Sequence, residues 1–244
     1  MTTPTPVIGL LYPGSAAEDD FPALVRRLDG VVRLPVVHTS VGEDAHRVDA
    51  LLDLGSEQRL ADGARELAAQ EPDSVVWACT SGSFVFGWQG ARDQVEQLAA
   101  VTGLPTSSTS IAFANAARVL GIRTVAVAAS YPSDVANSFV DFLAGAGVGV
   151  ATMSSHDILT AAEVGLLERE AVLELARSVD TAGADALLVP DTAMHSLAWL
   201  DELESAVGMR VLTANQVSVW EGLRLLGPVP QLEGLGSLFL AEPA

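Results

Sequence analysis

The chain has 244 residues, of which 49% are hydrophobic, and it carries a formal net charge of −18. This charge opposes long-range approach to nucleic acids and to anionic membrane surfaces, so we expect neither as a partner. All thirteen basic residues are arginine. The absence of lysine excludes Schiff-base catalysis, lysine-anchored pyridoxal phosphate and the phosphate-binding loop that depends on a lysine.

Targeting, disulfide and cofactor signals are also missing from the sequence. The start, MTTPTPVIGL, does not read as a signal peptide, and no apolar run approaches the ~18 residues of a membrane span, so we expect a cytoplasmic protein. The single cysteine cannot form an intrachain disulfide. The four histidines lack the spacing of metal ligands, and no GxGxxG motif is present, so we predict no metal and no cofactor.

Short β-rich runs alternate along the chain with stretches of helical period, which is the pattern of βαβ units around parallel strands. We predict strands at residues 7–12, 31–37, 74–79, 124–130, 147–153, 186–190 and 209–214. We predict helices at residues 17–28, 56–70, 89–102, 110–120, 133–145, 167–182, 197–207 and 216–226. The predicted fold class is therefore α/β.

An internal repeat divides the chain into two similar halves. The matching segments are 8–28 with 125–145, 63–81 with 174–193, and 101–121 with 206–227. Because the segments recur in the same order, we predict two pseudo-symmetric α/β halves, each with a parallel sheet flanked by helices, and an active site in the cleft between them. The predicted domains are residues 1–110 plus 214–244, and residues 111–213.

The repeat places Cys79 and Asp191 at equivalent positions, each at the carboxyl end of the third strand of its half. Ligands of open α/β sheets bind beyond these strand ends. A thiol and a carboxylate would then lie on opposite sides of one small molecule, which is the arrangement needed for proton transfer at both faces of a carbon. The alternatives are a buried, inert cysteine and an aspartate that only caps a helix.

Six motifs carry a resemblance to a known family. They are IGLLYP near the start, CTSGSF at 79–84, GLPTSSTS at 103–110, ASYPSDVANSF at 129–139, PDTAMHSL at 190–197 and TANQVSVWEGLRLLG at 213–227. Over about residues 7–227 the chain resembles the aspartate/glutamate racemase superfamily, in the branch of maleate cis-trans isomerase and arylmalonate decarboxylase. The resemblance implies two pseudo-symmetric domains, no cofactor, and small carboxylic acids as substrates.

The resemblance also implies roles for individual residues. Cys79 would act as nucleophile or base, while Thr80, Ser81 and Tyr131 would hold a substrate carboxylate. Hydroxyl and turn N–H groups aimed at a carboxylate stabilise the charge that enters it when the α-carbon loses a proton or carbon dioxide. The turn at Thr192 would hold further carboxylate oxygens.

The chain departs from the family pattern at three places. Asp191 stands where relatives have a second cysteine, and an aspartate is a weaker base than a thiolate. The loop Pro13, Gly14 and Ser15, which we expect to contact substrate, replaces an asparagine-containing loop of the maleate isomerases. Ala161 replaces an asparagine that would hold the distal carboxylate of maleate.

The favoured function is a cofactor-independent isomerase of the maleate-isomerase type, in which the Cys79 thiolate adds to a double bond and is eliminated after rotation. One alternative is a decarboxylase-like lyase or an amino-acid or hydantoin racemase that uses Cys79 and Asp191 as a proton-transfer pair. Another is a non-catalytic carboxylate-binding protein. We expect a homodimer or a higher homo-oligomer.

Overall fold

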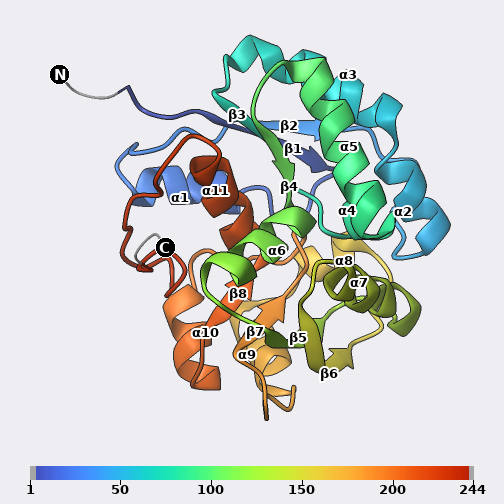
Figure 1. The fold of residues 1–244 in the computed structure, drawn as a ribbon, viewed down its shortest axis with the longest axis vertical. Coiled ribbons are helices and arrows are strands. Elements are labelled where there is room, and N and C mark those ends of the chain that lie inside the picture. The colour runs from blue at the N-terminus through green and yellow to red at the C-terminus, as the bar shows by residue number, and fades with distance from the viewer. Residues whose placement is uncertain (1–3, 242–244) are drawn as a thin grey trace.

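Two four-stranded parallel sheets form the framework of the computed structural model, which describes residues 4–241. The first sheet contains β1 (Ile8–Pro13), β2 (Val36–Thr39), β3 (Ser74–Trp77) and β4 (Thr106–Ser108), in the order β2-β1-β3-β4. The second contains β5 (Thr124–Ala129), β6 (Gly149–Ser155), β7 (Ala186–Val189) and β8 (Val211–Thr213), in the order β6-β5-β7-β8. The equivalent orders confirm the predicted pseudo-symmetric α/β fold, with one sheet in each half of Figure 1.

Helices flank both sheets. They are α1 (Asp20–Arg27), α2 (Val48–Leu54), α3 (Glu57–Leu67), α4 (Ser81–Phe84), α5 (Gly87–Thr102), α6 (Thr109–Val119), α7 (Ser133–Gly145), α8 (Ala161–Gly165), α9 (Arg169–Arg177), α10 (Leu200–Val207) and α11 (Ala214–Arg224). Because helices cover the sheets, the inner strands are buried along their lengths, as the run of four buried residues in β7 shows. This burial explains why the strands read as apolar runs in the sequence.

The structure differs from the predicted elements where an element is short or polar. The strand predicted at residues 31–37 begins only at Val36, because Pro35 and the irregular chain before it interrupt the ladder, leaving an isolated bridge at Arg33. The prediction missed β4, whose sequence TSS reads as a polar turn. It also missed α2, α4 and α8, which have seven, four and five residues and offer too few turns for a helical period.

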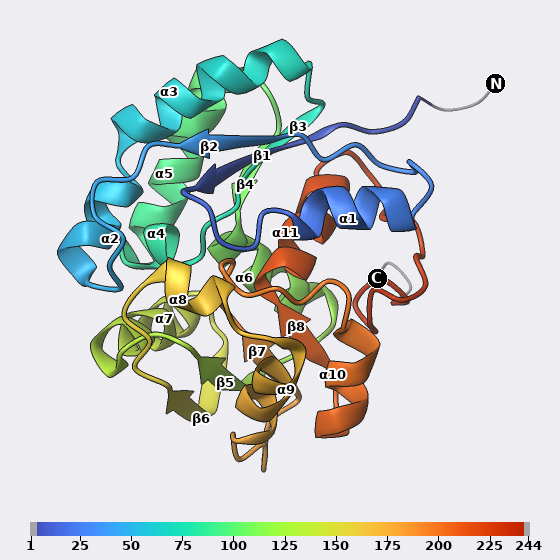
Figure 2. The same ribbon diagram turned by 180° about the vertical axis from the view of Figure 1, so that it is seen from behind.

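One apolar core joins the two halves. Phe84 of α4 packs against Phe139 of α7 with ring centroids 5.1 Å apart, and Phe113 of α6 lies 5.7 Å from the same ring. Helices α6 and α11 also pack against each other between the two sheets, as both ribbon views show (Figures 1 and 2). The shared core fixes the strand ends of one sheet relative to those of the other.

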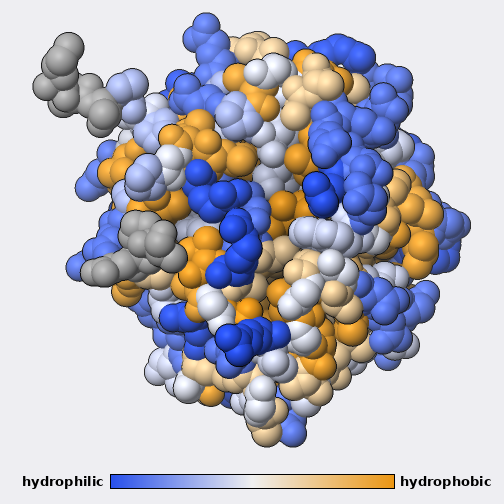
Figure 3. Space-filling view, viewed as in Figure 1, coloured by the Kyte–Doolittle hydropathy of each residue, from blue (hydrophilic) through white to orange (hydrophobic). Residues whose placement is uncertain are grey.

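Exposed apolar side chains occur in several segments of the described chain. On the face shown in Figure 3, apolar residues are interspersed with hydrophilic ones. Large exposed apolar side chains such as Val31, Val101 and Leu166 are far apart in the sequence. Within residues 4–241 no helix has the length and apolar character that crossing a membrane requires. The predicted homo-oligomer stays a prediction, as does the division into two domains.

Candidate active site

A cavity of about 220 Å³ lies where the carboxyl ends of strands from both sheets converge. Its lining includes the segments that follow β1, β3 and β7, together with the loop between β2 and α2. Both Cys79 and Asp191 line it, the first from the half of β3 and the second from the half of β7. The two groups that the repeat predicted to be equivalent therefore border the same space.

Cys79 lies at the turn between β3 and α4 and is 3% exposed. Its Sγ accepts a hydrogen bond from the backbone N–H of Gly82 at 3.3 Å, and the Ser81 hydroxyl lies 3.9 Å away. A Cβ at position 82 would come within 3.1 Å of the sulfur, so glycine lets the turn close around it. Burial raises the pKa of the thiol to about 12. The hydrogen bonds lower this pKa, and the negative charge of Asp191 raises it further. At neutral pH the thiol is therefore protonated.

Asp191 follows β7 and is 5% exposed. One carboxylate oxygen accepts the N–H of Ala193 at 2.9 Å, and the other accepts a hydrogen bond from the hydroxyl of Ser130. The helix-capping alternative is wrong for this residue, because the next helix, α10, begins only at Leu200. Its carboxylate is instead held in a fixed orientation at the cavity wall.

The other predicted substrate-binding residues fall into two groups. Pro13, Gly14, Ser15, Ser81 and Thr192 all line the cavity. The loop after β1 turns sharply at Gly14, whose φ of +65° lies in the left-handed region that favours glycine.

Thr80 and Tyr131 are buried behind the cavity wall instead of lining it. The Tyr131 hydroxyl donates to the carbonyl of Pro190 at 2.5 Å. The Thr80 hydroxyl has no hydrogen-bond partner within the described part of the chain. Direct contact of these two residues with a carboxylate stays a prediction.

An apolar wall completes the cavity, and no motif in the sequence indicated it. Val41 belongs to the loop after β2, and Leu51 and Leu54 belong to α2. His46, on the same loop, also lines the cavity. Because α2 is short and the loop has no periodic pattern, only the three-dimensional arrangement brings these residues to the site.

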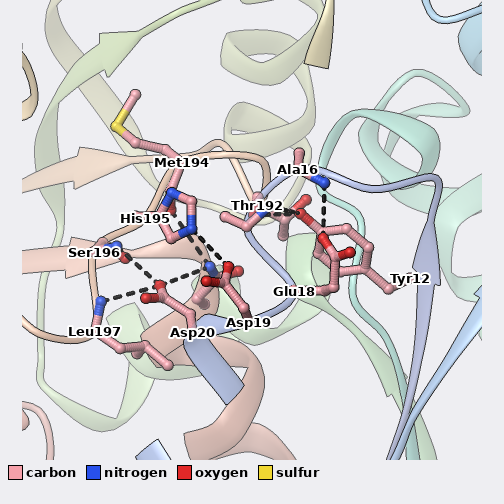
Figure 4. A network of polar contacts seen from close by, with 12 residues as sticks. Tyr12, Ala16, Glu18, Asp19, Asp20, Thr192, Met194, His195, Ser196 and Leu197 are labelled. Atoms are coloured by element: carbon pink, nitrogen blue, oxygen red, sulfur yellow. Dashed lines mark hydrogen bonds and ion pairs between the residues drawn. The ribbon is translucent and has the colours of Figure 1, made fainter. Parts of the chain in front are cut away.

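A network of hydrogen bonds ties the loop after β7 to the first half of the chain (Figure 4). The Tyr12 hydroxyl donates to the carbonyl of Thr192 at 3.0 Å. The buried Asp20 carboxylate accepts the N–H groups of Ser196 at 2.9 Å and Leu197 at 3.2 Å, and the side-chain amide of Asn215 at 3.1 Å. These bonds position the turn that carries Asp191 and Thr192.

Asp20→Ala is expected to lower the free energy of unfolding by about 3 kcal/mol, because it leaves buried N–H donors without an acceptor. Chemical denaturation measures this change. Asp19→Ala is the matched control: Asp19 is 76% exposed and pairs with His195 at 2.7 Å, so its loss should cost no more than about 1 kcal/mol. Equal stability of the two variants would show that the Asp20 network does not hold the loop.

The sequence of this chain is similar to those of known decarboxylases and isomerases. A model of the arylmalonate decarboxylase family matches residues 54–239. The arylmalonate decarboxylase of Bordetella bronchiseptica is 27% identical, over 96% of this chain and 97% of that protein. The maleate isomerase of Nocardia farcinica is also 27% identical, over 97% of this chain and 96% of that protein.

A solved structure shares the fold. It is a cysteine-to-serine mutant of the Nocardia farcinica maleate cis-trans isomerase with a covalently bound succinylcysteine intermediate, and it superposes with a TM-score of 0.82 at 24% identity, covering 96% of this chain and 98% of that one. The relatives confirm the predicted superfamily branch. They include both kinds of enzyme that the motifs indicated, and cysteine chemistry is shown directly for one of them.

Proposed function

The chain belongs to the arylmalonate decarboxylase family, and from this premise we propose that it is a cofactor-independent enzyme that transfers a proton to the α-carbon of a small carboxylic acid. The observation that carries the proposal is that Cys79 and the Asp191 carboxylate line the same cavity, in which burial raises the pKa of the thiol. A neutral thiol is an acid, and a carboxylate is a base. The pair is therefore suited to proton exchange.

The turns after β3 and β7 would hold the substrate carboxylate. Ser81 and Thr192, each with a hydroxyl group in its side chain, line the cavity from these two turns. When the α-carbon loses carbon dioxide, the electron pair of the broken bond delocalises into the carboxylate that remains. Hydrogen-bond donors fixed around that carboxylate stabilise the resulting enediolate.

Cys79 would then complete the reaction. Its S–H bond breaks as the proton moves to the α-carbon, and the thiolate that is left recovers a proton from water. The high pKa of the thiol keeps the proton in place until the strongly basic enediolate forms. In a racemisation, Asp191 would take the α-proton on one side of the carbon and Cys79 would deliver a proton on the other.

The wall of Val41, Leu51 and Leu54 favours a substrate with an apolar substituent. Burying an aryl or alkyl group there gains roughly 25 cal/mol for each Å² removed from water. A malonate with one apolar substituent satisfies both the polar and the apolar sides of the cavity.

Cis-trans isomerisation is the second candidate, and the maleate isomerase relative with 97% coverage of this chain supports it. In that reaction the Cys79 thiolate adds to the double bond, so its proton must first be removed. Burial and the charge of Asp191 both oppose this step, because both raise the pKa of the thiol. The proton-transfer reaction needs no such prior ionisation.

Solvent deuterium distinguishes the two reactions. The protein is incubated in deuterated water with maleate, aryl-substituted malonates, hydantoins, and α-amino and α-hydroxy acids, and the products are followed by NMR. We expect deuterium at the α-carbon of a malonate product. Fumarate formed from maleate without deuterium uptake would instead support covalent addition, and binding without any reaction would support a non-catalytic carboxylate receptor.

We also propose the cytoplasm as the location and a homodimer or higher homo-oligomer as the assembly. The assembly follows only from the prevalence of symmetric oligomers among enzymes of this kind. Light scattering of the purified protein measures its assembly state.

A further inference from the structure

Gln94 of α5 contacts the turn that carries Cys79 from outside the cavity. Its side chain is buried, at 6% exposure, and it is not part of the cavity lining. Its side-chain nitrogen Nε2 donates to the carbonyl of Gly55 at 2.8 Å and to the carbonyl of Gly82 at 3.0 Å. Because the amide nitrogen carries two hydrogens, these two bonds use both of them. One side chain therefore links two separate backbone segments.

The two carbonyls belong to segments that form the active site. Gly55 ends α2, the helix that contributes the leucines of the apolar wall. The last carbonyls of a helix have no donor within that helix, and Gln94 supplies one from outside. Gly82 belongs to α4, and its N–H donates to the Sγ of Cys79 at 3.3 Å. Gly82 is thus bonded to the thiol through its N–H and to Gln94 through its carbonyl.

The end of α2 also lies directly against the Cys79 turn. A Cβ added at Gly55 would come within 2.0 Å of the Gly82 carbonyl oxygen and 2.8 Å of Gln94 Nε2. The φ of Gly55 is −87°, which any residue adopts, so the short distance and not the backbone conformation requires glycine here. Because close-packed interiors transmit small shifts, a displacement at this contact moves the apolar wall relative to the thiol.

We propose that Gln94 is a positioning residue that holds the apolar wall in place relative to the Cys79 thiol, and so determines which face of the α-carbon receives the proton. This inference rests on the proposed function, in which the wall receives the apolar substituent and Cys79 delivers the proton. The wall sets the orientation of the substrate, while the thiol approaches from one side. Without the two bonds from Gln94, the wall and the turn shift independently and the substrate also binds with its other face towards the sulfur.

Gln94→Met tests the proposal, because methionine has a similar length but no amide. A malonate with one methyl and one aryl substituent is supplied to the protein, and the product enantiomers are separated by chiral chromatography. We expect the variant to form at least roughly 10% of the opposite enantiomer, since the enantiomer ratio reports the difference between two barriers. Gln97→Met, at an exposed position of the same helix, should keep a single enantiomer. A merely structural role would lower both rates equally and leave the ratio unchanged.

A second readout needs no substrate. The bond from the Gly82 N–H lowers the pKa of the Cys79 thiol, so its displacement in Gln94→Met should raise that pKa. At a given alkaline pH, iodoacetamide should then alkylate Cys79 more slowly, with the pH profile moved to higher pH. General loosening would instead raise the rate at every pH. If the unmodified protein turned over no malonate, the proposed function would fail while this profile still tested the positioning role.

Gly55→Ala tests the same contact while Gln94 stays in place. Its methyl group cannot fit against the Gly82 carbonyl, so α2 must move away from the turn, and the opposite enantiomer should again form. Gly149→Ala, at the start of β6, is the matched control, because the nearest atom to an added Cβ lies at an ordinary 3.5 Å. An unchanged enantiomer ratio in either folded variant, or an unchanged alkylation profile in Gln94→Met, would overturn the proposal.

Discussion

Cys79→Ala is expected to lower turnover of an accepted substrate by a factor of roughly a thousand or more, because it removes the group that reacts at the α-carbon. Binding should change little, since Ser81 and Thr192 at the cavity wall remain in place. Turnover is measured by NMR, and affinity by calorimetry with the same carboxylate. Cys79→Ser should lose nearly as much activity, because a hydroxyl is a far weaker acid than a thiol.

Thermal unfolding supplies the control for this prediction. Within residues 4–241 the sulfur accepts a single hydrogen bond shorter than 3.5 Å, from the N–H of Gly82, so the variants should stay folded. If Cys79→Ala retained more than about a tenth of the activity, the thiol would be packing material and the proton donor would have to be another group.

Asp191→Asn is expected to have two separate effects. Turnover should fall by a factor of roughly a hundred or more, because the amide can neither accept nor supply the proton. The pKa of Cys79 should also fall, since the carboxylate charge that disfavours the thiolate is gone. At a given alkaline pH the variant should therefore react faster with iodoacetamide than the unmodified protein, and mass spectrometry of the alkylated Cys79 measures this rate as a function of pH.

The pH dependence of the alkylation rate is what distinguishes this prediction from general loosening of the structure. Removal of a negative charge moves the pH profile of alkylation towards lower pH, whereas local unfolding would raise the rate at every pH. Asp19→Asn is the control, because Asp19 is exposed and lies outside the cavity lining. An unchanged profile in Asp191→Asn would show that the two side chains do not interact across the cavity.

The fold could be predicted from the sequence because it is repeated within the sequence. Each half presents its buried parallel strands as apolar runs in the same order, and this internal comparison identified Cys79 and Asp191 as equivalent strand-end residues. Both line one cavity in the structure. The Pro13–Ser15 loop was also placed correctly at the cavity, since a segment that directly follows an inner parallel strand must lie at that edge of the sheet.

Residues positioned by tertiary contacts could not be predicted in the same way. His46 reaches the cavity because its loop is bonded to Leu159 and Ile158, more than a hundred residues away in the chain. The apolar wall depends on the short helix α2, which has no detectable period. Tyr131 was predicted to hold a substrate carboxylate, but its hydroxyl donates a hydrogen bond to the Pro190 carbonyl.

The stereochemistry of protonation tests most directly whether Cys79 delivers the proton. A prochiral malonate with one methyl and one aryl substituent is decarboxylated in deuterated water, and the product is resolved by chiral chromatography and mass spectrometry. Because the thiol lies on one side of the cavity, the product should be a single enantiomer with one deuterium at the α-carbon, and Cys79→Ala should form almost none of it. A racemic product, or the same enantiomer formed at an undiminished rate by Cys79→Ala, would contradict the role assigned to Cys79.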